Sequence, residues 1–195
     1  MAQLSPIFTI GYGARDINAF ISVLHRHGIA YLIDIRSRPY SRYKPEFSKE
    51  TLEDLLRQAG IRYVYMGDSL GGRPDAPECY DLEGKVDYAK VAQQDFYKSG
   101  IERLAKAHSQ GVAVSLMCSE GKPEMCHRSK LIGKTLLQRG IPVAHIDEHD
   151  ELITQDDVLA RLTGGQLSLF GTDLMPGTSR KRYGPTGHEQ EDEDE

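Results

Sequence analysis

The chain has 195 residues, enough for one folded domain with a short extension and a core that needs no disulfide scaffold. Its hydrophobic fraction of 39% is ordinary for a soluble globular protein, and no apolar run approaches the roughly 18 residues of a membrane span. Six of the 29 acidic residues lie in 189–195, so the net charge of −5 comes from that run. The rest of the chain has 24 basic and 23 acidic residues and is nearly neutral. This balance excludes a protein that coats nucleic acid with a wholly basic surface.

Short apolar runs alternate with longer segments of helical periodicity. This alternation implies parallel strands joined by right-handed crossovers. We therefore predict an α/β fold, a three-layer Rossmann-like domain over residues 1–163 with a mostly parallel sheet. A flexible, disordered tail is predicted over 164–195, whose Gly, Ser, Pro and charged residues cannot bury a core. About five strands are expected, near 7–10, 31–35, 63–66, 112–117 and 142–146, with helices near 16–27, 48–59, 87–109, 127–138 and 154–162.

Polar residues follow these strands at the edge of the sheet where ligands bind in open α/β folds. The segment 34–45 carries four cations and two tyrosines, which suit phosphate oxygens and nucleobases. The alternative is a solvated loop in which Arg36 pairs with Asp34. Glycine after the first strand serves a tight turn or the close approach of a ligand. The predicted ligand or phosphate contacts are Gly11, Tyr12, Arg36, Arg38, Arg128 and His145.

The segment 118–128 is the richest in reactive side chains and joins a strand to a helix. A cysteine near a helix N-terminus and cations can become a thiolate, and a glutamate can move a proton. The segment matches no cysteine phosphatase loop, zinc deaminase signature or Walker loop. Buried thiols that pack as small apolar groups are the alternative. The predicted catalytic residues are Cys118, Glu120, Cys126 and His127, while the spacing of the Cys and His residues fits no common zinc site, so neither a metal nor a cofactor is predicted.

Several of these segments together resemble one bacterial family, domain of unknown function 488. The resemblance spans about 5–162, and its most specific part is the Cys-x-Glu…Cys-His-Arg block. It implies the domain and the position of the site, but it implies no reaction, because the family has no established activity. The segments that carry it are Thr9–Tyr12, Asp34–Ser37 with Pro39, Met117–Glu120, Cys126–Arg128 and His145–Ile146.

A pentapeptide at 166–170 resembles the motif by which bacterial DNA-handling proteins dock on the replication sliding clamp. Leu169 and Phe170 would fill an apolar pocket, Leu167 would support them, and Gln166 would fix the register. A flexible segment suits such docking because it must reach its partner. The alternative is that these apolar residues fold back on the domain as an edge strand.

Three cysteines are too few and too unevenly spaced for a disulfide framework, which favours the reducing cytoplasm, and the N-terminus predicts no signal peptide. We expect a DNA-associated protein tethered to the sliding clamp, and an enzyme acting on a nucleotide or DNA lesion. Its expected partners are the clamp and a nucleotide or DNA, with no membrane. The alternatives are a non-enzymatic nucleotide- or DNA-binding adaptor, and a small-molecule thiol or hydrolytic enzyme unrelated to DNA.

Overall fold

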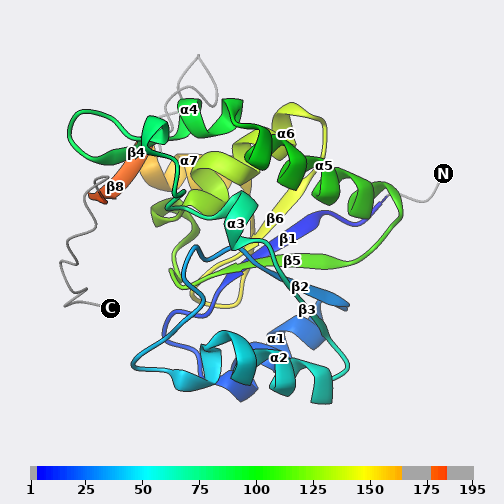
Figure 1. Cartoon of the computed structure of the whole chain (residues 1–195). Helices are drawn as coiled ribbons and strands as arrows, with labels where there is room; N and C mark the ends of the chain where they lie inside the picture. Colours follow the sequence, from blue (N-terminus) through cyan, green and yellow to red (C-terminus); the bar gives the residue numbers. More distant parts are fainter. Residues whose placement is uncertain (1–3, 164–176, 184–195) are drawn as a thin grey trace.

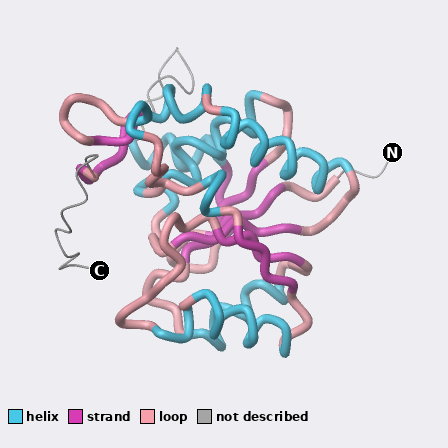
Figure 2. Tube along the Cα trace, viewed as in Figure 1, coloured by secondary structure: helices cyan, strands magenta, loops and turns pink. Residues whose placement is uncertain are grey.

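A computed structural model describes residues 4–163 and 177–183, in which a central sheet is covered by helices on both faces (Figures 1 and 2). The sheet has six strands in the order β3-β2-β5-β1-β6-β7, and only β7 runs antiparallel to its neighbour. The fold is therefore α/β, three-layered and mostly parallel, as predicted. Its strands are β1 (Ile7–Gly11), β2 (Tyr31–Asp34), β3 (Arg62–Tyr65), β5 (Val114–Cys118), β6 (Val143–Ile146) and β7 (Leu152–Thr154).

Helices α1 and α2 cover one face of the sheet, and the remaining helices lie on the other side (Figure 1). Asp16 caps α1 by accepting a hydrogen bond from the amide of Ala19, and Gly28 follows the helix with a positive φ of 63°. The α-helices are α1 (Ile17–Arg26), α2 (Lys49–Gln58), α3 (Gly67–Leu70), α4 (Tyr88–Gln93), α5 (Asp95–Ser109), α6 (Lys134–Gln138) and α7 (Gln155–Thr163). Short 3₁₀ turns form at η1 (Pro45–Phe47), η2 (Pro77–Cys79) and η3 (Pro123–Met125), and η4 (Arg128–Gly133) is a π-helix.

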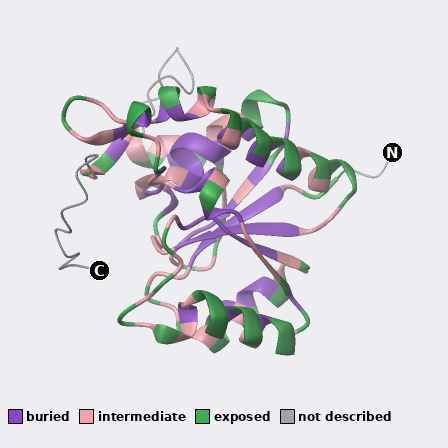
Figure 3. Cartoon of the chain, viewed as in Figure 1, coloured by how far each residue is buried: buried purple, intermediate pink, exposed green. Residues whose placement is uncertain are grey.

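Each face of the sheet packs on its own apolar core, and the four inner strands, β2, β5, β1 and β6, are mostly buried (Figure 3). Adjacent residues of a strand point to opposite faces, so Leu32 joins the core beneath α1 and α2 while Ile33 joins the core beneath α5. Both faces must therefore be apolar, which explains the short, continuous hydrophobic strands of the sequence. No helix among the described residues is both long enough and apolar enough to cross a membrane.

A two-stranded ribbon lies outside the main sheet, where β4 (Lys85–Asp87) pairs antiparallel with β8 (Thr178–Arg182). Ser179 is buried, and its hydroxyl accepts a hydrogen bond from the amide of Val86. The carbonyl of Gly177 accepts a hydrogen bond from the amide of Tyr88. Within the range 164–195 that the sequence predicted as a tail, Thr178–Arg182 forms a strand, because backbone pairing orders this polar segment without an apolar face. The predicted clamp motif at 166–170 and the acidic run at 189–195 lie outside the described residues.

Candidate active site

The carboxyl end of β5 brings together the two cysteines of the predicted site. Cys118 is the last residue of the strand, and Cys126 directly follows the η3 turn. Their Sγ atoms lie 2.9 Å apart, both thiols are free, and only 3% and 6% of these residues are exposed. The two cysteines are eight positions apart in the sequence, and the fold brings their sulfurs into direct contact in a nearly enclosed site.

Arg128 holds this loop together from within, and none of its surface is exposed. Its Nη2 donates to the carbonyl of Gly121 at 2.7 Å, and its Nη1 lies 3.6 Å from the Sγ of Cys118. Its backbone amide lies 3.5 Å from the Sγ of Cys126 and opens the π-helix η4. Single turns of π-helix are rare and are frequently found at functional sites. The side chain of Arg128 therefore contacts the sulfur of Cys118, and its backbone amide contacts the sulfur of Cys126.

The environments of the two sulfurs push their pKa values in opposite directions. Burial alone would raise the pKa of Cys126, but the Cys118 thiol, the Arg128 guanidinium and the Arg128 amide outweigh burial, so the pKa is lowered. The pKa of Cys118 is raised well above its usual value by burial and by its contact with Cys126. Cys126 is therefore the more acidic of the two thiols, and its contact with Cys118 favours the thiolate form of Cys126 over that of Cys118.

His127 and Glu120 flank the sulfurs in different ways. The Nδ1 of His127 lies 3.5 Å from the Sγ of Cys126, and burial lowers the pKa of this imidazole, which favours its neutral form. Glu120 faces β8, with its Oε2 3.5 Å from Arg180, and it also accepts the amide of Lys122. Arg180 is a site neighbour that the sequence analysis missed, although its basic run, 179–183, is visible in the sequence.

Gly11 and Tyr12 join β1 to the cysteine loop. A Cβ atom at Gly11 would lie 1.8 Å from the carbonyl oxygen of Glu120 and 2.6 Å from Nη1 of Arg128. The amide of Tyr12 donates to the carbonyl of Cys118 at 3.1 Å. The glycine is thus required for the close approach of the loop to β1.

Arg36 is engaged inside the protein, as in the alternative left open by the sequence. It forms a two-pronged ion pair with the fully buried Asp34, which also accepts the hydroxyl of Tyr63. Arg38 is exposed, and Arg128 is occupied by the cysteine loop. The three arginines predicted as ligand or phosphate contacts therefore do not contact one another or a common group.

His145 lies in β6 and is fully buried. One ring nitrogen, Nδ1, lies 2.7 Å from the hydroxyl of Thr9, and the other, Nε2, lies 2.8 Å from Oε1 of Gln155. Burial lowers the pKa of His145 to about 4, so the ring is neutral. Both nitrogens are used within the fold, and neither is left for the ligand predicted there.

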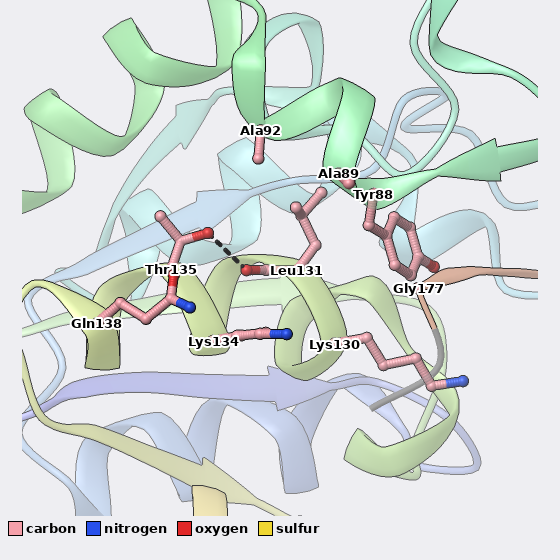
Figure 4. Close-up of a pocket in the computed structure, with 9 residues that line it drawn as sticks. All are labelled: Tyr88, Ala89, Ala92, Lys130, Leu131, Lys134, Thr135, Gln138 and Gly177. Carbon is pink, nitrogen blue, oxygen red and sulfur yellow. Dashed lines mark hydrogen bonds between the residues drawn. The ribbon is translucent and has the colours of Figure 1, made fainter. Parts of the chain in front are cut away.

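A pocket of about 150 Å³ lies between α4 and the helices η4 and α6 (Figure 4). Two lysines, Lys130 and Lys134, line it beside the hydroxyl of Thr135, but none of the sequence-predicted site residues does. Across residues 4–163 and 177–183, no three His, Cys, Asp or Glu side chains are grouped so that they could hold a metal ion.

Comparison with known protein families identifies the family to which the chain belongs. The family described as domain of unknown function DUF488 matches residues 16–134, more than half of the chain. The protein belongs to this family. The matched stretch of DUF488 contains the cysteine loop, whereas Gly11 and His145 lie outside it. No curated protein matches the chain, and no solved structure matches it either.

Proposed function

We propose that this DUF488 protein is a cysteine-dependent enzyme that acts on a nucleotide or on a DNA lesion, with Cys126 as the nucleophile. The observation that supports this proposal most strongly is the position of the Cys126 sulfur. It lies 2.9 Å from the Cys118 sulfur and 3.5 Å from the amide of Arg128, and its pKa is lowered despite burial. A thiolate is the reactive form of cysteine, and lowering its pKa is a common way to activate it.

Each neighbour has a separate role in the proposed reaction. The thiolate of Cys126 attacks an electrophilic carbon; a carbon–sulfur bond forms while the bond from that carbon to its leaving atom breaks. The leaving atom takes the electron pair and accepts a proton from water. Cys118 and Arg128 stabilise the thiolate before the attack. Because only 6% of Cys126 is exposed, a small group or an extruded nucleotide suits the site better than an intact duplex.

Substitution of the nucleophile tests this function. Short oligonucleotides that carry alkylated or abasic sites are incubated with wild-type protein and with Cys126→Ser, and both DNA and protein are followed by mass spectrometry. We expect a change in the DNA, or a covalent adduct on Cys126, only with wild-type protein. Cys79→Ser is the matched control, because Cys79 is equally free but lies in η2 and is fully buried. Equal turnover by Cys126→Ser contradicts the proposal.

We also propose that the pentapeptide Gln166, Leu167, Ser168, Leu169 and Phe170 tethers the enzyme to the replication sliding clamp. The support is the sequence match alone, in which two adjacent apolar anchors stand in a polar segment. The expected dissociation constant is on the order of micromolar, since ordering a flexible peptide costs free energy. In a calorimetric titration, Leu169→Ala with Phe170→Ala should abolish binding and Ser168→Asp should preserve it. No heat of binding from wild-type protein at tens of micromolar clamp, roughly ten times that dissociation constant, overturns the tether.

A second candidate is a small-molecule thiol enzyme unrelated to DNA. It is favoured by the internal engagement of Arg36 and Arg128, which removes two of the guanidinium groups expected to hold phosphates. This candidate predicts that Cys126 reacts with small electrophiles in a saturable way, while DNA neither competes nor becomes modified.

A further inference from the structure

The loop formed by residues 38–43 presents aromatic rings to solvent. Tyr40 is 73% exposed and Tyr43 is 66% exposed, and no other aromatic side chain in the described part of the chain is among its exposed large apolar residues. Arg38 and Arg42 are exposed in the same loop. Large apolar rings that are grouped on the surface contribute nothing to the core, and such groups often mark the place where a partner binds.

The loop is held in place on both sides, so the exposed rings stand on an ordered base. The ammonium of Lys44 donates to the carbonyls of Gly13 and Arg15 at 2.8 and 2.7 Å. The amide of Lys49 donates to the carbonyl of Pro39 at 2.8 Å. Such contacts reduce the conformational entropy that the loop would lose on binding a ligand.

A second tie joins this loop to the candidate active site through one residue. The hydroxyl of Tyr12 lies 3.5 Å from the hydroxyl of Ser41, while the amide of Tyr12 donates to the carbonyl of Cys118. The ring of Tyr12 stacks on Phe47 with 4.3 Å between centroids. A strand lying on the loop would therefore run beside the edge of the sheet that carries the sulfurs.

The charges of the loop favour an anionic partner. Arg38, Arg42 and Lys49 form no ion pair with an acid anywhere in residues 4–163 and 177–183. The Arg42 guanidinium stands 5.9 Å from the centre of the Tyr43 ring. Lys49 also stands over a ring, that of Tyr65, at 4.8 Å. Exposed rings beside cations that pair with no acid are the combination that binds single-stranded nucleic acid, because bases stack on the rings while cations contact phosphates.

We propose that residues 38–43, together with Lys49, bind single-stranded DNA and deliver one of its nucleotides to Cys126. Tyr40 and Tyr43 stack on bases, and the cations contact the backbone. A duplex hides the faces of its bases, so the surface prefers single strands. This inference names the substrate class of the proposed enzyme and rests on that proposed function.

Fluorescence anisotropy with a labelled twelve-nucleotide DNA strand tests the surface directly. Tyr40→Ala and Tyr43→Ala should each weaken binding by roughly 5- to 150-fold, the usual range for loss of one base stack. Three phosphate contacts predict that the logarithm of the association constant falls with the logarithm of salt concentration with a slope of about −2. Tyr40→Phe retains the ring and should bind as wild type.

Two exposed positions away from the loop serve as matched controls. Leu82 is a fully exposed apolar residue, and the Arg57 side chain on α2 is 72% exposed, so Leu82→Ala and Arg57→Ala should leave binding unchanged. Equal affinity of wild type, Tyr40→Ala and Tyr43→Ala overturns the inference, as does tighter binding of duplex DNA or of single-stranded RNA. The titration needs no catalysis, so absence of DNA binding overturns this surface, whereas an unreactive Cys126 in an alkylation assay overturns the proposed nucleophile.

Discussion

The two strands that flank β1 end in polar clusters of opposite kinds. At β6, the ring of His145 has a partner at each nitrogen, Thr9 on one side and Gln155 on the other. At β5, Nε of Arg128 is buried without a hydrogen-bond partner among the described residues, beside two sulfurs in contact. Buried polar groups are normally satisfied, so an incomplete cluster calls for an explanation such as a catalytic role. The complete cluster stabilises the fold, and the incomplete one is where we propose that the chemistry takes place.

Burial affects the pKa values of His145 and Cys126, but it determines the direction of the shift only for His145. At His145, burial lowers the pKa to about 4 and fixes the neutral ring. At Cys126, burial opposes the charged form, yet the contacts of Cys118 and Arg128 reverse its effect. The comparison teaches that burial fixes the direction of the pKa shift only where nearby charges and hydrogen bonds do not outweigh it.

The largest expected effect comes from forcing the cysteine loop away from β1. Gly11→Ala places a Cβ 1.8 Å from a backbone oxygen of Glu120, and we expect a loss of about 3 kcal/mol or more in the free energy of unfolding. Gly121→Ala, in the same loop, meets its nearest atom at 3.6 Å and should cost little. Urea unfolding measures both variants. Similar free energies of unfolding for Gly11→Ala and Gly121→Ala would show that the close contact between the loop and β1 is not required for stability.

The second prediction concerns the complete cluster and its dependence on pH. His145 has a lowered pKa in the folded state, so the unfolded chain binds the proton more readily below pH 6.5. The stability contributed by the neutral ring is present above about pH 6.5 and is lost as pH falls toward 4, by about 3 kcal/mol.

Urea unfolding of wild type and His145→Gln at several pH values isolates this contribution. The stability advantage of wild type over the variant should shrink between pH 7 and pH 4. An advantage that stays constant over this interval would mean that His145 has an ordinary pKa and that its cluster is not closed.

A smaller effect is expected from β8, which lies against the β5 site through Arg180 and Glu120. Ending the chain after residue 176 removes the Ser179 hydroxyl from the amide of Val86 and the Gly177 carbonyl from Tyr88. We expect a loss of about 2 kcal/mol, roughly 1 kcal/mol for each hydrogen bond. Ending the chain after Tyr183 leaves these contacts intact and serves as the control. Equal melting temperatures of the two truncated proteins would contradict the role given to β8.

Much of the fold follows from local pattern, whereas the state of each site residue does not. The alternation of strands and helices and the Asp16 cap are visible in the sequence, and the strand-to-helix segment 118–128 predicted that Cys118 and Cys126 share a site. By contrast, the closure of His145 depends on Thr9, 136 positions away, which no local pattern reveals.

The ribbon partner β8 was missed for a related reason. A polar strand such as Thr178–Arg182 has no periodic apolar face, and its order comes from backbone pairing with a distant segment. Arg36 shows the intermediate case: the sequence offered both a phosphate contact and a pair with Asp34, and only the three-dimensional arrangement distinguishes them.

The rate of alkylation of Cys126 as a function of pH, followed at the level of individual peptides, tests the central claim most directly. Restricted access of the reagent slows the reaction at every pH but does not move its midpoint, so the midpoint reports the pKa of the thiol. We predict a midpoint for Cys126 below the ordinary value for cysteine, and a shift to higher pH in Cys118→Ala, because the contact with the Cys118 thiol is removed. Cys79, whose pKa is raised by burial, provides the internal comparison. A midpoint for Cys126 at or above that of Cys79, or one that is unchanged in Cys118→Ala, would contradict the account.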